Sequence, residues 1–351
     1  MNKNTQSRFQ RNGKMRTRTL LRILVMGWLF VIPRQSVAAD PKPLVVYSAR
    51  MEQFIKPVFD AYTKATGVAI QFLTDKEGPL LQRLIAEGAD SPADLFITVD
   101  AGMLWKAAEE HLLKPVQSAT LTANIPAHLR DPDGNWFGLS IRARTIVFHT
   151  KRVRKEDLTT YEALGDPKWK KRLCLRTSKK IYNQSMIAMM IAALGESKTE
   201  EIVRSWMGNL ATDVFPDDTK VMEAMTAGIC DVGIVNSYYY GRLIEKDPTI
   251  PLALFWPNQK GRGVHVNISG AGVLRHTKHE KEAVRLLEWL SGKEAQSLFA
   301  DANLEYPANP AVTPDAKVAR WGTFKQDQIN VNVAGKLQID AVKLMDRAGY
   351  K

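Results

Sequence analysis

Cysteine, which binds soft metals and forms the disulfides of small domains, is rare in this chain. Only two cysteines, Cys174 and Cys230, occur among 351 residues. Their spacing fits no zinc motif, and one pair is too few for a disulfide-built scaffold. The two thiols either pair in an oxidising compartment or remain free and buried, because the sequence does not show whether their Cα atoms come within the ~7 Å bridging limit.

Acidic residues are absent from residues 1–39, which carry eight Lys and Arg side chains. A run of ten residues there, ILVMGWLFVI, is followed by a proline and the small-residue stretch SVAA. A basic start, a short apolar run and a small-residue end are typical of a cleavable signal peptide, and the run is shorter than the ~20 residues of a spanning helix. We predict a signal peptide over 1–39 and export to the periplasm, with Met15 as a second candidate start. An uncleaved membrane anchor is the alternative.

Excess positive charge is also scarce once this segment is set aside. The full chain has 49 Lys and Arg against 37 Asp and Glu, a formal net charge of +12. Subtracting the eight basic residues of 1–39 leaves 41 against 37, or +4. This balance, without an arginine-rich run, gives no argument for nucleic-acid binding. We expect a soluble, monomeric mature form.

Motifs of hydrolytic enzymes are missing as well. The sequence contains no HExxH, no G-x-S-x-G and no evident Cys–His pairing. Four of the six histidines are scattered along the later part of the chain, and surface or core roles suit them better than metal ligation: His149, His265, His276 and His279. The sequence therefore predicts a protein that is not an enzyme.

What is present is an alternation of apolar strands and amphipathic helices, which predicts an α/β protein with mainly parallel sheets flanked by helices. About 310 mature residues fit two lobes of ~150 each. We predict lobe 1 over 40–141 with a return segment at about 269–310, lobe 2 over 142–268, and a C-terminal helical segment over 311–351 that packs on the lobes. Ligands of such folds bind at the carboxyl ends of strands, often in the crevice between lobes.

Tyrosines mark the candidate site. Tyr238, Tyr239 and Tyr240 follow the predicted strand CDVGIVNS, where it meets a helix, and Tyr182 lies in KKIYNQSM. Phenolate oxygens suit hard, highly charged cations, and a trivalent ion favours the deprotonated form. Each ligand then releases a proton, so affinity should fall as the pH falls. The alternative is that these rings only pack at a domain interface.

Several segments, in order and spacing, resemble the periplasmic ferric-ion-binding proteins of ABC importers over about 44–312. These segments are VYSAR, SPADLFITVDAG, LRDPDGNWFGLSIRAR, DPKWKKRL, IYNQS, DVGIVNSYYYGRL, NQKGRGVHVNISGAGVL and EYPANP. The resemblance implies two hinged, transferrin-like lobes that close on one Fe(III) without catalysis. It also implies delivery to an inner-membrane permease and ATPase. By this resemblance the iron ligands are Tyr182, Tyr238 and Tyr239. Successive helical residues diverge by ~100°, so Tyr240 is expected to point elsewhere and pack.

The resemblance also implies a synergistic anion, carbonate or bicarbonate, because three phenolates leave coordination positions open. Guanidinium groups bind planar oxyanions through paired hydrogen bonds. The candidates are Arg142 and Arg242, with Arg144 and Arg50 as second choices; each is alternatively a salt-bridge partner.

Related members carry a histidine and a tyrosine soon after the first strand, where this chain has Met51 and Glu52. Glu52 is a candidate ligand or a surface carboxylate at a helix start. A binding protein of the same fold for an organic cation or anion, such as thiamine or a polyamine, is the alternative function.

Overall fold

The computed structural model describes residues 42–351. The predicted signal peptide, 1–39, lies outside the described residues. Among residues 42–351, no helix is long and apolar enough to cross a membrane.

The described chain alternates strands and helices for most of its length. The strands are β1 (Leu44–Ser48), β2 (Ile70–Thr74), β3 (Leu95–Thr98), β4 (Phe137–His149), β5 (Leu173–Cys174), β6 (Val232–Asn236), β7 (Leu252–Phe255), β8 (Val266–Val273) and β9 (Tyr306–Pro307). The helices up to β8 are α1 (Glu52–Thr66), α2 (Glu77–Glu87), α3 (Ala101–Glu109), α4 (Ala119–Asn124), α5 (Ile181–Leu194), α6 (Glu196–Asn209), α7 (Asp218–Thr226) and α8 (Ser237–Lys246). The later helices are α9 (Glu280–Leu290), α10 (Lys293–Asp301), α11 (Ala316–Ala319), α12 (Val333–Lys336) and α13 (Gln338–Arg347).

Helix α1 illustrates how the sequence sets these elements. Ile55, Val58, Phe59 and Tyr62 recur at helical spacing and are the buried residues of the helix. The helix stops at Gly67, which has a φ of 74° and donates its N–H to the carbonyl of Thr63. Glycine occupies this left-handed position without the steric cost that a Cβ would bring.

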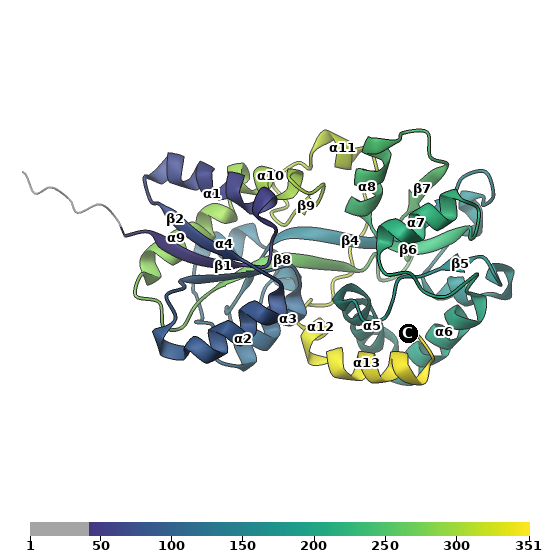
Figure 1. Cartoon of the computed structure of the whole chain (residues 1–351), viewed down its shortest axis with the longest axis horizontal. Helices are drawn as coiled ribbons and strands as arrows, with labels where there is room; N and C mark the ends of the chain where they lie inside the picture. The colour runs from purple at the N-terminus through teal and green to yellow at the C-terminus, as the bar shows by residue number, and fades with distance from the viewer. Residues whose placement is uncertain (1–41) are drawn as a thin grey trace, which may run out of the picture. The chain divides into compact units, whose positions relative to one another are not determined.

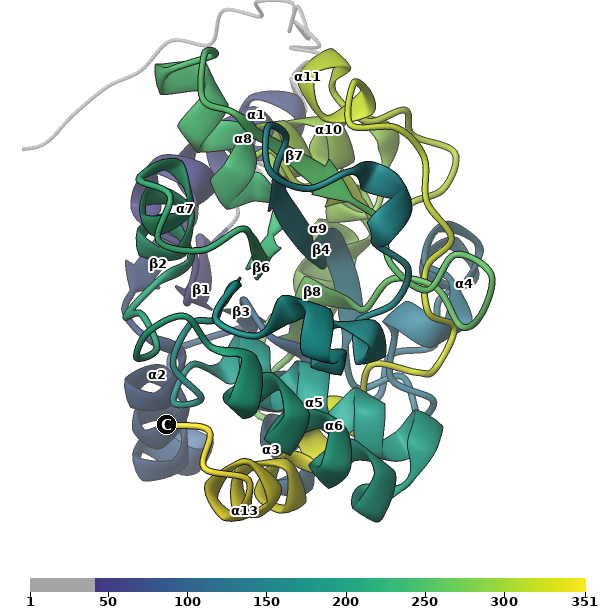
Figure 2. The ribbon, with the colours of Figure 1, turned by 90° about the vertical axis from the view of Figure 1, so that its right-hand side faces the viewer.

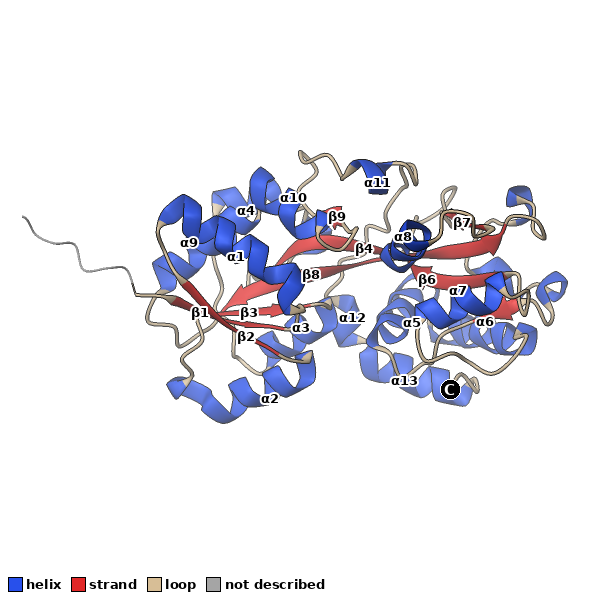
Figure 3. Ribbon diagram, turned by 45° about the horizontal axis from the view of Figure 1, so that its top comes forward, coloured by secondary structure: helices blue, strands red, loops and turns tan. Residues whose placement is uncertain are grey.

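Two long strands run through the middle of the sheet, as Figure 3 shows. The strand order is β2-β1-β3-β8-β4-β6-β5, and β7 and β9 also pair with β4. Strands β1, β2 and β3 are parallel, as are β5 and β6. Strand β4 pairs antiparallel with both β6 and β8, so it links the two parallel groups.

The hydrophobic core divides along β4. One core includes Ala143 and the side chains of β1, β3 and β8, whereas two others begin at Ile146 and Val147 and include those of β6. We call the elements around the first core lobe 1 and those around the other two lobe 2. Figures 1 and 2 show α1, α2 and α3 beside β1–β3, and α5, α6 and α7 beside β5 and β6. The two-lobed α/β fold agrees with the sequence expectation, and the lobe boundaries stay a prediction.

Some elements differ from those expected. Strand β4 begins at Phe137, inside a segment that reads as loop because of its Pro, Asp and Gly content. The helical region after β8 consists of two helices, α9 and α10, separated at Ser291 and Gly292. Strands β7 and β9 are both short, and each pairs with β4.

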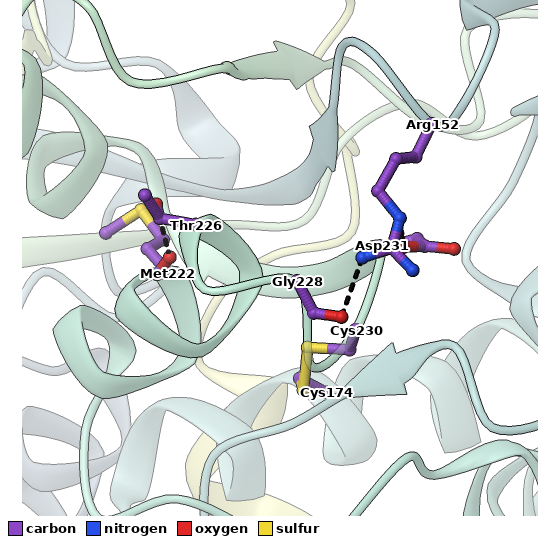
Figure 4. The surroundings of a disulfide bond; sticks show 7 residues. All are labelled: Arg152, Cys174, Met222, Thr226, Gly228, Cys230 and Asp231. Atoms are coloured by element: carbon purple, nitrogen blue, oxygen red, sulfur yellow. Dashed lines mark hydrogen bonds and ion pairs between the residues drawn. A yellow bond between two sulfur atoms is a disulfide. The ribbon is translucent and has the colours of Figure 1, made fainter.

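A disulfide joins Cys174 of β5 to Cys230, which precedes β6. Their Cα atoms are 5.9 Å apart, so the pairing left open by the sequence is the disulfide. Figure 4 shows Arg152 beside it, with hydrogen bonding to the carbonyl of Gly228 and an ion pair to Asp231.

Candidate metal centre

A cavity of about 360 Å³ brings most of the predicted site residues together. Both lobes and β4 contribute to its walls. From lobe 1 come Ala49, Arg50, Met51, Phe54, Lys76, Glu77, Val99, Asn303 and Glu305; from β4 and lobe 2 come Arg142, Lys180, Tyr182, Tyr238, Tyr239 and Arg242.

Tyr182 is the second residue of α5 and is half-buried. Burial raises the pKa of Tyr182 to about 12, although nearby Arg142 favours the phenolate. The guanidinium carbon of Arg142 lies 5.4 Å from the ring centroid, and the amino nitrogen of Lys180 lies 4.5 Å from it. The N-terminal end of α5 and the charge of Arg142 offset only part of the cost that burial places on the phenolate.

Tyr238 and Tyr239 occupy the first turn of α8, directly after β6 ends at Asn236. This is the strand-to-helix junction that the sequence predicted, and both side chains line the cavity. Their ring centroids are 4.4 Å apart. Tyr238 is 3% exposed, and burial, with the neighbouring phenols of Tyr182 and Tyr239, raises its pKa well above the ordinary range. The charged form of Tyr238 therefore needs a cation nearby.

The junction itself is fixed by a buried carboxylate of α7. Asp218 accepts hydrogen bonds from the backbone N–H of Asn236, at 2.9 Å, and from Arg144, at 3.1 Å. Asn236 in turn donates from Nδ2 to the hydroxyl of Tyr238, at 3.4 Å. The first turn of α8 is thus held against lobe 2.

Tyr240 points away from the cavity, as expected. Its hydroxyl donates to the carbonyl of Leu252 at 3.3 Å, and its ring packs edge-on against Trp321, with centroids 6.1 Å apart.

Arg142 and Arg242, the first choices for anion binding, both line the cavity. Arg142 donates from Nη2 to the carbonyl of Ile268 at 2.6 Å, and its buried Nε has no hydrogen-bond partner within residues 42–351. Burial alone lowers the pKa of Arg142, but the phenols and Glu305 more than offset this and raise it. The guanidinium carbon of Arg242 lies 5.2 Å from the ring centroid of Tyr238.

The two second-choice arginines differ in position. Arg50 lines the cavity, where its Nη1 pairs with Glu305 at 3.0 Å. Burial lowers the pKa of Arg50. Burial also opposes ionisation of Glu305, but the charges of Arg50 and Arg142 and the hydrogen bonds of Ser140 and Asn303 together outweigh it and hold the pKa of that carboxyl below its usual range. Arg144 is not part of the cavity lining, and its guanidinium pairs with Asp218 inside lobe 2.

Glu52, the lobe 1 carboxylate considered from the sequence, is exposed in the first turn of α1 and does not line the cavity. Sequence reasoning missed two acidic residues that do line it, Glu77 and Glu305. Glu305 belongs to EYPANP, one of the segments that carry the family resemblance, but no role followed from that segment. Glu77 lies in none of these segments. Burial raises the pKa of Glu77.

The donor set of this cavity is phenolic rather than imidazole- or thiolate-based. Within residues 42–351, no group of three or more His, Cys, Asp or Glu side chains is placed to hold a metal. Three phenols and nearby guanidinium groups are donors for a hard cation and for an oxyanion, respectively.

Comparison with known proteins identifies the family. The sequence pattern of the bacterial extracellular solute-binding protein family matches residues 90–330. The chain belongs to this family. A solute-binding protein is a component of a transport system.

Individual members of the family support the resemblance to ferric-ion-binding proteins. Iron uptake protein A1 of Synechocystis sp. is 38% identical over 325 residues, which cover 91% of this chain and 90% of that protein. A solved structure of the Trichodesmium solute-binding protein (IdiA, FutA) in complex with iron and citrate ligands has 42% identity and a TM-score of 0.85, over 88% of this chain and 100% of that chain. The ferric iron-binding protein A of Mannheimia haemolytica, in an open conformation, has 35% identity and a TM-score of 0.83, over 88% and 99%. The expected family and two-lobed fold are therefore confirmed.

Proposed function

We propose that this solute-binding protein carries ferric iron across the periplasm to an ABC importer. The observation that carries the proposal is the convergence of Tyr182, Tyr238 and Tyr239 on one cavity. Relatives named for iron uptake and a similar structure that holds iron support the choice of cargo.

In the proposed complex, three phenolates from lobe 2 balance the charge of Fe(III). Phenolate oxygen is a hard donor, and the ion's own charge offsets the cost that burial places on the ionised phenols. The positive N-terminal ends of α5 and α8 add to this stabilisation.

Carbonate or bicarbonate is the proposed synergistic anion. Arg142 and Arg242 are its donors, because both line the cavity beside the tyrosines. Arg50 supports the same wall through Glu305. Arg144 is the weaker candidate, since its guanidinium is engaged by Asp218.

The importer's permease and ATPase are the proposed partners, and the protein acts by binding and release without catalysis. Export by the predicted signal peptide would place the mature, monomeric form in the periplasm.

A ferric titration tests this function. Ferric citrate added to the purified protein, with and without bicarbonate, should produce a visible phenolate-to-iron charge-transfer band that bicarbonate strengthens. Tyr238→Phe or Tyr239→Phe should weaken and shift the band, because one of the three phenolates is lost. Tyr240→Phe should leave the band unchanged, because the Tyr240 hydroxyl bonds to Leu252 outside the cavity. A colourless wild-type complex would refute the proposal.

A further inference from the structure

The lobe 1 wall of the cavity contains a carboxylate that the proposed function leaves without a role. Glu77 is the first residue of α2, is half-buried, and faces the same cavity as the three tyrosines. Glu52, the other candidate from this lobe, is exposed and outside the lining.

Glu77 has no side-chain partner among the described residues, unlike the other carboxylate of the cavity lining. Its side chain makes no hydrogen bond and no ion pair with any residue in 42–351, although the charges of Lys180 and Arg142 act on it across the cavity. The other lining carboxylate, Glu305, is instead saturated by Arg50, Ser140 and Asn303. The carboxylate of Glu77 therefore stays accessible from the cavity. A cation in the cavity can bind it without displacing another partner.

The charges of the cavity are compatible with a fourth anionic ligand. Three phenolates match a trivalent ion, and one carboxylate adds a single excess negative charge. Arg142, Arg242 and Lys180 line the same cavity and can offset that charge together with the charge of a bound anion. A carboxylate oxygen is as suitable for a hard cation as a phenolate.

We propose that Glu77 is the lobe 1 ligand of the metal, so that the ion is held by oxygens from both lobes. This inference rests on the proposed function, because it takes ferric iron as the cargo. In this proposal the lobe 1 ligand comes from α2. Met51 and Glu52, at the start of α1, do not supply it. A ligand from lobe 1 binds only when the lobes are close, so it gives the metal a higher affinity for the closed state.

The test compares Glu77→Gln with the matched variant Glu52→Gln, both loaded with ferric citrate. Loss of even an outer-shell partner commonly weakens metal binding by about 10–100-fold, so loss of this ligand should release iron to excess EDTA at least about tenfold faster. Glu77→Gln should keep the charge-transfer band, because the tyrosines remain. Glu52→Gln should release iron at the wild-type rate. Glu77→Asp, which draws the carboxylate back by one methylene, should also release iron faster.

The outcomes separate the two proposals. If wild type has no band, the ferric function fails, and the inference fails with it. If wild type has the band but Glu77→Gln releases iron as slowly as wild type, only the ligand role of Glu77 is refuted. A faster release from Glu52→Gln alone would likewise overturn it.

A competing role for Glu77 is an ion pair with Lys180 that closes the lobes without metal. Small-angle X-ray scattering of metal-free wild type and Glu77→Gln distinguishes this role. The ligand proposal predicts the same radius of gyration for both metal-free proteins and a larger radius for the iron-loaded variant than for iron-loaded wild type. A metal-free variant that is more expanded than metal-free wild type would contradict it.

Discussion

At the scale of single residues, the buried His265 is expected to make the folded state less stable at low pH. It is 5% exposed, and its Nδ1 has no hydrogen-bond partner within the described chain. Burial, with the charges of Arg144 and Arg262, lowers its pKa to about 3. An unfolded histidine has a pKa of ~6.5, so between these values the unfolded state binds more protons. The contribution of neutral His265 to the free energy of unfolding is fully present above about pH 6.5. It is lost as the pH falls towards 3, by at most about 1.4 kcal/mol per pH unit.

We therefore expect His265→Gln to lose less stability on acidification than wild type. Urea unfolding at pH 7, 5.5 and 4.5 measures the free energy of unfolding of both proteins. Carboxylates elsewhere titrate in both, so the difference between the two slopes isolates the histidine. Parallel slopes would show that His265 does not contribute.

Residue-level reasoning from sequence was most specific where a motif marked a position. It predicted Tyr182, Tyr238 and Tyr239 for one site and Tyr240 elsewhere; the first three line one cavity, and their role as ligands stays a prediction. It could not find Glu77, because a glutamate at the start of a helix is an ordinary pattern and only the packing of two lobes brings it to the tyrosines.

The arginines show why strand alternation was insufficient. Arg142 and Arg144 alternate along β4, which predicts that they share a face. The hydrophobic core of lobe 1 ends on β4 at Ala143, and a core of lobe 2 begins at Ile146. Arg144 forms an ion pair with Asp218 of α7, whereas Arg142 lines the cavity. The partner that decides this difference is more than seventy residues away in sequence.

At the scale of elements, the disulfide ties β5 to the start of β6 across a sequence separation of 56 residues. Cross-linking such a loop restricts the unfolded chain and typically contributes about 2–4 kcal/mol. Cys174→Ser combined with Cys230→Ser should therefore lower the free energy of unfolding in urea by about this amount. Because neither cysteine lines the cavity, the folded variant should still develop the ferric band.

Dithiothreitol provides the control for this prediction. It should destabilise the wild-type protein and leave the double variant unchanged. Equal unfolding midpoints for oxidised wild type and the double variant would contradict a stabilising role.

Element prediction followed the strength of the local pattern. Helix α1 is readable from sequence because its apolar residues recur at helical spacing and a glycine ends it. The four-residue β7 and the two-residue β9 are not readable in this way, because their pairing with β4 depends on distant residues rather than on their own composition.

At the scale of the whole molecule, alternation of strands and helices was enough to predict an α/β fold with two lobes. It did not show that β4 runs through both, because the first residues of that strand follow a turn-rich segment. Strand β4 links the two groups of parallel strands, so it is the element about which lobe movement is expected.

We expect the metal-free protein to sample an open cleft and to become more compact when iron binds. Only a ligand with higher affinity for the closed state shifts this equilibrium, and a metal held from both lobes has that property. Small-angle X-ray scattering with and without Fe(III) should show a decrease in the radius of gyration. An unchanged radius would mean that lobe 2 alone holds the ion.

The most direct test of the central claim is anomalous diffraction at the iron edge from crystals soaked in ferric citrate. The account predicts one strong peak in the cavity, in contact with the phenol oxygens of Tyr182, Tyr238 and Tyr239. Iron bound elsewhere on the protein, or an organic molecule enclosed among these rings, would contradict it.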